Sequence, residues 1–189
     1  MLSDKGRITL EINAPAPIFK LNDIFDREID LSTYKGKKVL IAFFRHAGCP
    51  FCNTRVHSLI KHQEELKAKG LEMIFFFESK KKILLSSNFH RSVSPIPLIS
   101  DPEKLWYDKY GVESSALKSS KSHFTSFFQK VFEAKKKNLP MHWMSGHESI
   151  KTIPAEFLMD QYGMIRKVHY AKGLRDRMAM ETIWEFTST

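Results

Sequence analysis

The stretch Phe43-Phe44-Arg45-His46-Ala47-Gly48-Cys49-Pro50-Phe51-Cys52-Asn53 holds both cysteines of the 189-residue chain, spaced as C-x-x-C. The apolar run 39–44 leads into it, and residues 50–69 lead out of it with apolar side chains at steps of three and four. Gly70 then stands where the end of a helix favours a left-handed residue. The sequence therefore predicts a strand, a tight loop and a helix.

The start of this helix decides the expected chemistry of the cysteines. Pro50 suits the first turn, where its missing N–H removes a donor that would be unpaired, so Cys49 falls at or beside the N-cap. Free N–H groups and the helix dipole favour a thiolate there, which predicts a nucleophilic Cys49 of low pKa. Cys52, one turn further, is placed to attack a mixed disulfide on Cys49. Arg45 and His46 could add positive potential, and so could Arg55 if its side chain turns back toward the loop.

Two cysteines close to histidines could instead hold a metal ion. A structural zinc site usually takes its second pair of ligands from a separate knuckle or helix, and the sequence has no second C-x-x-C and no H-x-x-x-H. His57 and His62 are five residues apart on the expected helix, which is not the spacing for a shared ion. We therefore predict no metal and no cofactor.

Length and composition favour one domain, residues 1–189, with its own core. Two cysteines this close cannot form a disulfide framework, so they indicate redox chemistry in a reducing compartment. Residues 1–10 lack the apolar core of a signal peptide, and no apolar run approaches the roughly 20 residues that span a bilayer. These features predict a cytoplasmic protein that has no membrane partner.

The formal net charge of +9 raises the question of nucleic-acid binding. The lysine runs 80–82 and 135–137 are the places to look, but each stands at the end of an expected element. Lysines in such places are more often solvated, and no nucleic-acid motif accompanies them. We expect no nucleic-acid partner.

Four stretches, in this order, resemble one known family. Residues 14–37 contain A-P-A-P-I-F and L-S-T-Y-K-G-K, residues 48–53 read G-C-P-F-C-N, residues 97–112 contain P-L-I-S-D-P and Y-G-V, and residues 153–163 begin I-P-A-E-F-L-M-D. Together they are similar to the peroxiredoxin-like members of the alkyl hydroperoxide reductase and thiol-specific antioxidant (AhpC/TSA) branch of the thioredoxin superfamily. The resemblance implies an α/β thioredoxin-like fold, with a central mixed sheet flanked by helices.

The remaining pattern fits an alternation of strands and helices. Strand candidates at 8–12 and 18–21, with a run ending at 28–31, predict an N-terminal β-hairpin at the edge of the main sheet. The apolar run 71–77 predicts a buried central strand. The other expected elements are a helix within 79–92, a strand over 97–100, a helix capped by Ser100 or Asp101 with Pro102 in its first turn, a hairpin turn at 160–163, a strand over 164–170 and a helix over 178–186.

Residues 113–150 exceed what a minimal thioredoxin fold needs and predict a helical insertion. Phenylalanines between Phe124 and Phe132 recur at helical spacing and form one apolar stripe. Core packing is the favoured interpretation; a lid over the cysteines or a homodimer contact stays open. The loop after this helix offers three candidates for substrate contact: His142, Trp143 and His147.

Pro154 precedes the strand expected after the insertion. Inside a strand it would cost a ladder hydrogen bond, so it belongs at the strand start. In thioredoxin-like proteins a cis proline lies across from the cysteine pair. The resemblance implies this position for Pro154, with the backbone of Ile153 available to pair with a bound chain.

Two chemistries compete for this site. As a peroxidase, Cys49 would attack a peroxide to give a sulfenic acid, which Cys52 would condense into a disulfide. As a thiol-disulfide oxidoreductase, Cys49 would attack a protein disulfide and Cys52 would release the product. Either cycle needs a thiol reductant, such as thioredoxin, glutaredoxin or glutathione. The family resemblance favours the peroxidase, and the C-x-x-C spacing favours the oxidoreductase.

The loop also departs from typical peroxiredoxins. They carry a threonine three residues before the attacking cysteine, where this chain has His46, and a proline near the place of Arg45. No residue of this chain is assigned to the family's later catalytic arginine. A non-catalytic redox-sensing or metal-binding module is therefore a third alternative.

Overall fold

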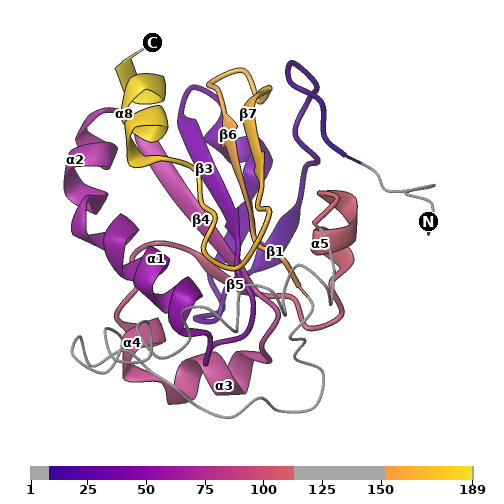
Figure 1. Ribbon diagram of the computed structural model, residues 1–189, viewed down its shortest axis with the longest axis vertical. Coiled ribbons are helices and arrows are strands. Elements are labelled where there is room, and N and C mark those ends of the chain that lie inside the picture. Colours follow the sequence, from indigo (N-terminus) through magenta and orange to yellow (C-terminus); the bar gives the residue numbers. More distant parts are fainter. Residues whose placement is uncertain (1–8, 113–151, 189) are drawn as a thin grey trace.

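A five-stranded mixed sheet forms the centre of the protein (Figure 1). The structure is a computed structural model that describes residues 9–112 and 152–188. The strand order is β5-β4-β3-β6-β7; β3, β4 and β5 are parallel, and β6 is antiparallel to both of its neighbours. The strands are β3 (Lys38–Phe43), β4 (Leu71–Phe77), β5 (Leu98–Ser100), β6 (Ala155–Met159) and β7 (Ile165–Tyr170). The predicted α/β class with a central mixed sheet is confirmed.

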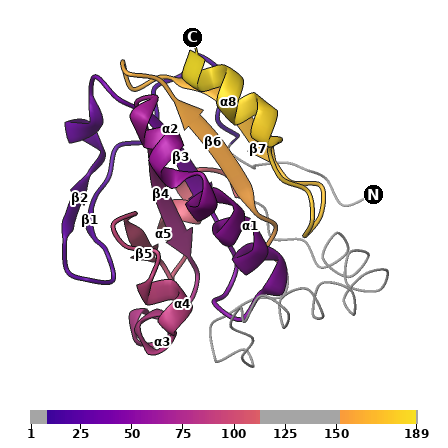
Figure 2. The ribbon, with the colours of Figure 1, turned by 90° about the vertical axis from the view of Figure 1, so that its left-hand side faces the viewer.

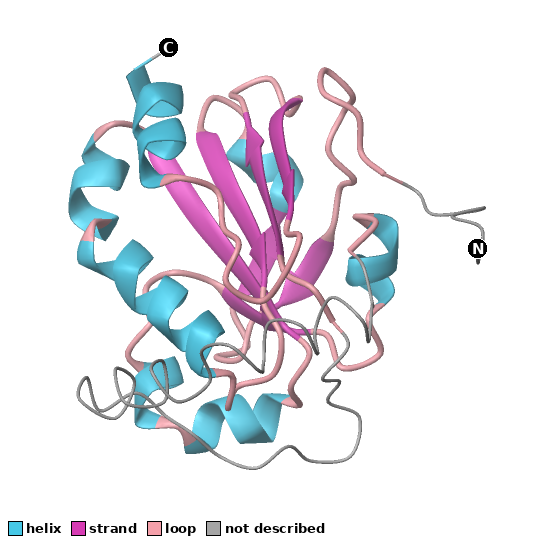
Figure 3. Ribbon diagram, in the orientation of Figure 1, coloured by secondary structure: helices cyan, strands magenta, loops and turns pink. Residues whose placement is uncertain are grey.

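Helices and a hairpin cover the two faces of this sheet (Figures 2 and 3). One face carries α1 (Pro50–Lys61), α2 (Gln63–Ala68) and α8 (Met180–Ser188). The other carries α5 (Leu105–Lys109), the hairpin β1 (Lys20–Asn22) and β2 (Glu28–Asp30), and the 3-10 helix η1 (Leu31–Tyr34). Two short helices, α3 (Lys81–Ser86) and α4 (Asn88–Arg91), lie at the end of the sheet where α1 begins.

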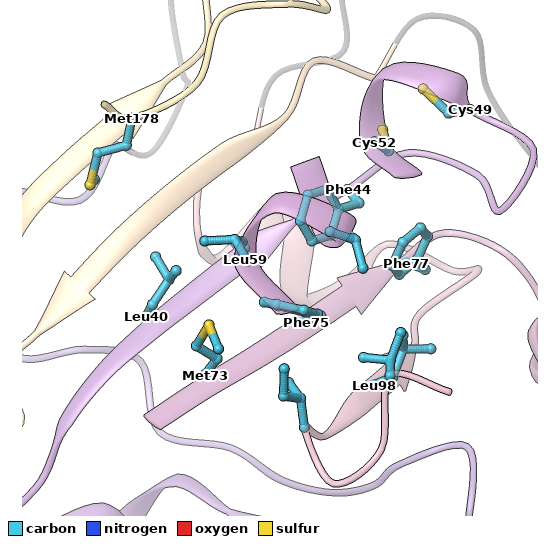
Figure 4. Close-up of a cluster of buried hydrophobic side chains, with 14 of the residues drawn as sticks. Leu40, Phe44, Cys49, Cys52, Leu59, Met73, Phe75, Phe77, Leu98 and Met178 are labelled. Atoms are coloured by element: carbon cyan, nitrogen blue, oxygen red, sulfur yellow. The ribbon is translucent and has the colours of Figure 1, made fainter. Parts of the chain in front are cut away.

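Successive side chains of β3 enter two different cores. Leu40 and Ala42 pack with the helices α1, α2 and α8, and part of this cluster is drawn in Figure 4. Val39, Ile41 and Phe43 pack with α5 and the N-terminal hairpin. All five side chains are buried, as expected for a strand covered on both faces. The strand that leads to the cysteines is therefore held from both sides.

The helix expected over 50–69 is two helices. The backbone of His62 leaves the helical range at φ −106° and ψ 9°, and α2 starts at the next residue. The ring of His62 packs edge-on against Trp184 of α8, with centroids 5.6 Å apart. Since Trp184 lies more than a hundred residues away in the sequence, the helical pattern of 50–69 could not reveal the break.

Two further helices differ from expectation. The helix expected within 79–92 is broken at Ser87, whose extended backbone separates α3 from α4 and whose hydroxyl accepts the N–H of His90. α5 begins at Leu105, so Pro102 lies outside it. The Asp101 carboxylate still accepts hydrogen bonds from the first N–H groups of this helix, as a capping side chain does.

The N-terminal region is only partly as predicted. The hairpin exists, but β1 and β2 form a separate two-stranded sheet, and a bond from Ile24 N to Leu98 O links its turn to β5. Residues 9–12, part of the expected first strand, form no β-strand. Instead Asn13 and Ala14 exchange backbone hydrogen bonds with Ile165 at the start of β7.

The C-terminal part follows the prediction. β6 and β7 form an antiparallel pair joined through a turn at 160–163, and α8 covers most of the expected last helix. The predicted insertion at 113–150, with His142, Trp143 and His147, lies outside the described residues. Among the helices that the structure describes, none is long and apolar enough to cross a membrane.

Candidate active site

Cys49 is the N-cap residue of α1, and Pro50 is its first helical residue. Cys49 donates its N–H to His46 O at 3.0 Å, and its own carbonyl accepts the N–H of Asn53 at 3.0 Å. Cys52 follows in the first turn, and Figure 4 shows both sulfurs at this end of the helix. The two cysteines are free thiols and are fully buried. The expected placement of the pair at a helix start is thus present.

Two arginines lie beside the sulfurs. Arg45 Nη1 is 3.5 Å from Cys49 Sγ, and the backbone N–H of Arg45 donates to Cys52 Sγ at 3.4 Å. Arg177 Nη2 is 3.9 Å from Cys52 Sγ. Because Arg45 is itself buried, its charge acts on Cys49 with little screening by water.

The two thiols differ in acidity. Burial raises the pKa of Cys49, but the hydrogen bond from Cys52 and the charges of Arg45 and Arg177 outweigh it and lower the pKa to about 6. Burial, together with the hydrogen bond to Cys49 and the charge of that residue, raises the pKa of Cys52 well above its ordinary value. At neutral pH Cys49 is therefore the thiolate and Cys52 is the thiol that donates a hydrogen bond to it.

The loop before the helix is fixed by contacts to neighbouring elements. Ser79 Oγ, just after β4, accepts the N–H of Ala47 at 2.7 Å, and the Asn53 side-chain amide donates to Ala47 O at 2.7 Å. The Tyr107 hydroxyl of α5 donates to Phe44 O at 2.5 Å. These contacts hold the thiolate site in one arrangement, which is what preorganisation requires.

Of the other basic residues proposed from sequence, Arg45 reaches the cysteines and Arg55 does not. His46 lies buried in the loop and binds Cys49 N–H through its carbonyl. Arg55 turns away from the loop and pairs with Glu156 of β6, at 2.8 Å from Nε to Oε1 and 2.9 Å from Nη2 to Oε2. Arg55 could add potential to the loop only if its side chain turned back toward it, and that condition is not met, because the buried Glu156 carboxylate holds its guanidinium.

Ile153 and Pro154 lie directly before β6 and are buried. The register pairs Phe43 with Ala155, which places Pro154 at the end of the sheet where the cysteine loop begins. The implied cis bond at Pro154 is wrong: the cis bond of the described chain is Ser94–Pro95. Pro154 O accepts the N–H of Ala171 at 3.1 Å, which extends the contact between the β6 and β7 segments with a trans peptide.

Sequence reasoning missed Arg177. It lies in the segment between β7 and α8, 125 residues after Cys52, and no motif marks it. A composition signal exists in hindsight, since Arg175 and Arg177 flank an aspartate just before the last helix. Only the fold brings this segment back to the first turn of α1.

Sequence reasoning also missed a buried polar link beside the site. Glu78, directly after β4, is fully buried; its Oε2 lies 2.9 Å from Lys104 Nζ and accepts the Thr152 hydroxyl at 2.7 Å. Lys104 Nζ also donates to Thr152 Oγ1 at 2.9 Å. The link anchors the chain that enters Ile153 and Pro154.

The described residues hold no group of three or more His, Cys, Asp or Glu side chains that could bind a metal ion. His62 contacts Trp184, and His46 uses its carbonyl on Cys49. The cysteine pair therefore has no third ligand within the part of the chain that the structure describes.

The fold and the cysteine pair define a thioredoxin-like protein, and solved structures agree. A thiol:disulfide interchange protein, DsbE, from Chlorobium tepidum superposes with a TM-score of 0.64 at 18% identity, covering 96% of this chain and 100% of that one. A thiol peroxidase from Chromobacterium violaceum gives 0.63 at 14% identity, covering 96% of this chain and 88% of the other. At these identities the likeness concerns the fold.

The family model of the AhpC/TSA family matches residues 12–168, and the chain belongs to this family. Peroxiredoxin Bcp of Escherichia coli K12 is 27% identical over 97 residues, which cover 51% of this chain and 62% of that protein. A protein of Buchnera aphidicola with the same Bcp peroxiredoxin name is 28% identical over 116 residues, 61% of this chain and 73% of the relative. The expectation of a peroxiredoxin-like AhpC/TSA protein, and with it an oxidoreductase, is confirmed.

Proposed function

We propose that the protein is a thiol-dependent peroxidase that cycles between a Cys49/Cys52 dithiol and a disulfide. The observation that carries the proposal is the buried thiolate site. Cys49 has a lowered pKa at the N-cap of α1, a guanidinium lies 3.5 Å from its sulfur, and a second thiol follows one turn away. Membership of the AhpC/TSA family supports it, as do relatives named as peroxiredoxins.

The cycle has three steps. The Cys49 thiolate attacks the terminal peroxide oxygen, the O–O bond breaks and Cys49 becomes a sulfenic acid; the alkoxide or hydroxide that leaves takes a proton from solvent and departs as alcohol or water. The Cys52 sulfur then attacks Cys49, a disulfide forms, and the sulfenic oxygen leaves as water with the proton of Cys52. A thiol reductant restores both thiols by exchange.

The residues around the pair have supporting roles in this proposal. Arg45 stabilises the thiolate, and Pro50 fits the first helical position, where its missing N–H leaves no unpaired donor. His46, Ile153 and Pro154 would form the wall that a substrate meets, because they lie at the same end of the sheet.

The reductant would be a small thiol or a thioredoxin-like or glutaredoxin-like protein, in a cytoplasmic, reducing compartment. Two adjacent free cysteines need such a supply of electrons to turn over. A homodimer belongs to the same proposal, because the apolar stripe predicted between Phe124 and Phe132 would suit a contact between two copies of the chain. Light scattering of the reduced protein would test the dimer directly.

A second function, reduction of protein disulfides, has its own supporting observation. The order Cys49, Pro50, Phe51, Cys52 places a thiolate at a helix N-cap with a resolving thiol three residues on, which suits attack on a disulfide sulfur as well as on a peroxide. The loop also lacks the threonine that typical peroxiredoxins use, with His46 in its place.

A non-catalytic redox sensor is the third alternative. Its Cys49 would be oxidised as in the peroxidase, but no catalytic cycle would follow.

The decisive experiment mixes the reduced protein with hydrogen peroxide and, in parallel, with a model protein disulfide. Rapid quenching and mass spectrometry follow the oxidation state of each cysteine. Faster oxidation by peroxide, through a sulfenic acid on Cys49, is expected. Faster exchange with the protein disulfide would select the oxidoreductase, and oxidation without turnover by any added thiol would select the sensor. Cys49→Ser is the control and should be inert in both arms.

A further inference from the structure

The segment that carries Arg177 is clamped on both sides. Behind it, Glu156 Oε2 accepts the N–H of Met178 at 2.8 Å, and Arg55 Nη2 donates to Met178 O at 2.9 Å. The buried Arg55–Glu156 pair thus holds both backbone polar groups of the residue next to Arg177. Arg55, Glu156 and Met178 are separated in the sequence, and their contacts join α1, β6 and the segment before α8.

The other flank of Arg177 is held by Asp176. Its Oδ2 accepts the N–H of Lys172 at 2.7 Å, and its Oδ1 lies 3.0 Å from His169 Nε2 of β7. Arg177 Nη1 donates to the carbonyl of Asp176 at 2.7 Å. The side chain therefore leaves a backbone that is fixed at the residue before it and at the residue after it.

Arg177 is poorly satisfied while Cys52 is a thiol. Its Nε is buried without a hydrogen-bond partner, and its Nη2 makes only a long contact of 3.9 Å with Cys52 Sγ. No carboxylate of the described residues lies within ion-pair distance of it. A buried cation of this kind gains most when negative charge develops beside it.

Negative charge develops on Cys52 when this sulfur attacks the oxidised Cys49, and again if Cys52 is the leaving sulfur when a thiol reductant reopens the disulfide. Arg45 already has the Cys49 sulfur as its partner, whereas Arg177 touches the sulfur of Cys52. We propose that Arg177 serves the resolving step: its guanidinium stabilises the thiolate of Cys52 during disulfide closure, and the Arg55–Glu156 pair is the positioning element that holds it there. The inference rests on the proposed dithiol cycle, and it holds for peroxide and for disulfide substrates alike.

The charged and titratable groups that face Cys52 come from three elements. Cys49 and Arg45 come from the loop and the start of α1, Arg177 from the segment before α8, and Tyr107 from α5, where the charge of Cys52 contributes to a raised pKa of the phenol. Of these, only the two arginines favour the Cys52 thiolate. Removing Arg177 should therefore shift closure to higher pH.

The test uses an aromatic model disulfide, whose released thiolate is coloured. The Cys49 thiolate attacks one sulfur, the S–S bond breaks, and one aromatic thiolate leaves. Cys52 then attacks the mixed disulfide at the Cys49 sulfur and releases the second thiolate, while its proton passes to solvent. Stopped-flow absorbance reports the two releases as two phases, so attack and closure are measured in one trace.

Arg177→Met should slow the second phase and leave the first nearly unchanged. At pH 8 the Cys49 thiolate stays near its maximum because the pKa of this thiol is about 6. A rise of one unit in the pKa of Cys52 lowers its thiolate fraction, and with it the closure rate, about tenfold. The pH profile of the second phase should move upward by the same amount.

Arg175→Met is the matched control, because it removes the same charge from the same segment, where the guanidinium lies over the ring of Phe51 instead. It should leave the second phase close to wild type. An unchanged closure rate in Arg177→Met, or an equal slowing in Arg175→Met, would overturn the inference.

The positioning role is tested by Glu156→Gln and, should that variant fold poorly, by Arg55→Lys. Each should slow closure while far-UV circular dichroism shows a folded protein, and combination with Arg177→Met should slow it little further, because both act through one side chain. Fully additive slowing would contradict the positioning role.

Failure of the peroxidase proposal would give a different result. Both phases would persist with the model disulfide, while peroxide would leave Cys49 unoxidised.

Discussion

Arg45 Nη1 lies 3.5 Å from Cys49 Sγ, although both side chains are buried. A cation removed from water costs free energy unless it meets a negative charge, and the Cys49 sulfur beside it can supply one. The thiolate and the guanidinium therefore stabilise each other. This relationship makes the acidity of Cys49 measurable through several independent experiments.

The first experiment measures the order in which the two cysteines are alkylated. Because the pKa of Cys49 is lowered to about 6 and that of Cys52 is raised, iodoacetamide should modify Cys49 with a midpoint near pH 6 and leave Cys52 untouched at neutral pH. Peptide mapping after timed quenching gives both profiles. Modification of Cys52 before Cys49 would reverse the assigned roles.

Arg45→Met should raise the pKa of Cys49, since it removes the charge that favours the thiolate. A rise of about one unit would lower the thiolate fraction at pH 6 several-fold and slow alkylation in proportion. Arg91→Met, which removes an exposed guanidinium from α4, serves as the control and should leave the profile in place. Equal profiles for the two variants would show that Arg45 does not set the acidity.

The lowered pKa of Cys49 also links stability to pH. The unfolded chain keeps this proton up to about pH 8.5, whereas the native state releases it near pH 6, so the unfolded state binds more protons in between. Stability of the reduced protein should therefore rise from pH 5 to pH 8, by about 2 to 3 kcal/mol more than in Cys49→Ser. Urea unfolding at the two pH values measures the difference, and parallel curves for both proteins would refute the link.

Cys52→Ser should stop turnover without stopping the first attack. Its sulfur is the group that resolves an intermediate on Cys49, so a sulfenic acid or a mixed disulfide should accumulate in this variant. Intact-mass measurement after one equivalent of oxidant detects it, and Cys49→Ser should trap nothing. About one zinc per chain in the purified wild type, with no trapped species in Cys52→Ser, would instead support the metal-binding alternative.

The Arg55–Glu156 pair should matter strongly for stability. Arg55→Met leaves a buried carboxylate without its cation, a change that typically costs about 3 to 5 kcal/mol. Lys81→Met breaks the exposed pair with Asp26 and should cost at most about 1 kcal/mol. Equal midpoints of urea unfolding for these two variants would show that the buried pair is not a structural anchor.

The part of the site formed by neighbouring residues can be predicted from the sequence. An apolar strand, a proline after the first cysteine and a helical pattern beyond it are short-range signals, and they place Cys49 at a helix N-cap without reference to the rest of the chain. The alternation of strands and helices likewise predicts the α/β class.

The remainder depends on contacts that the sequence does not encode locally. Arg55 is paired by Glu156, 101 residues away, and Arg177 reaches Cys52 across 125 residues. The break at His62 coincides with an aromatic contact to Trp184 from the last helix. Single-sequence patterns report which face of an element is apolar, but not which charged side chain another element will meet.

The link between Glu78, Lys104 and Thr152 brings together chain segments on either side of residues 113–151. A second hydrogen bond connects the same two parts of the chain: the Tyr170 hydroxyl donates to Tyr110 O at 2.8 Å. The described residues on either side of 113–151 are therefore attached to the core close to one another. For a flexible chain between two fixed points, doubling the length costs only about 0.6 kcal/mol. Homologues should therefore tolerate insertions and deletions between these two anchors while they keep the cysteine site.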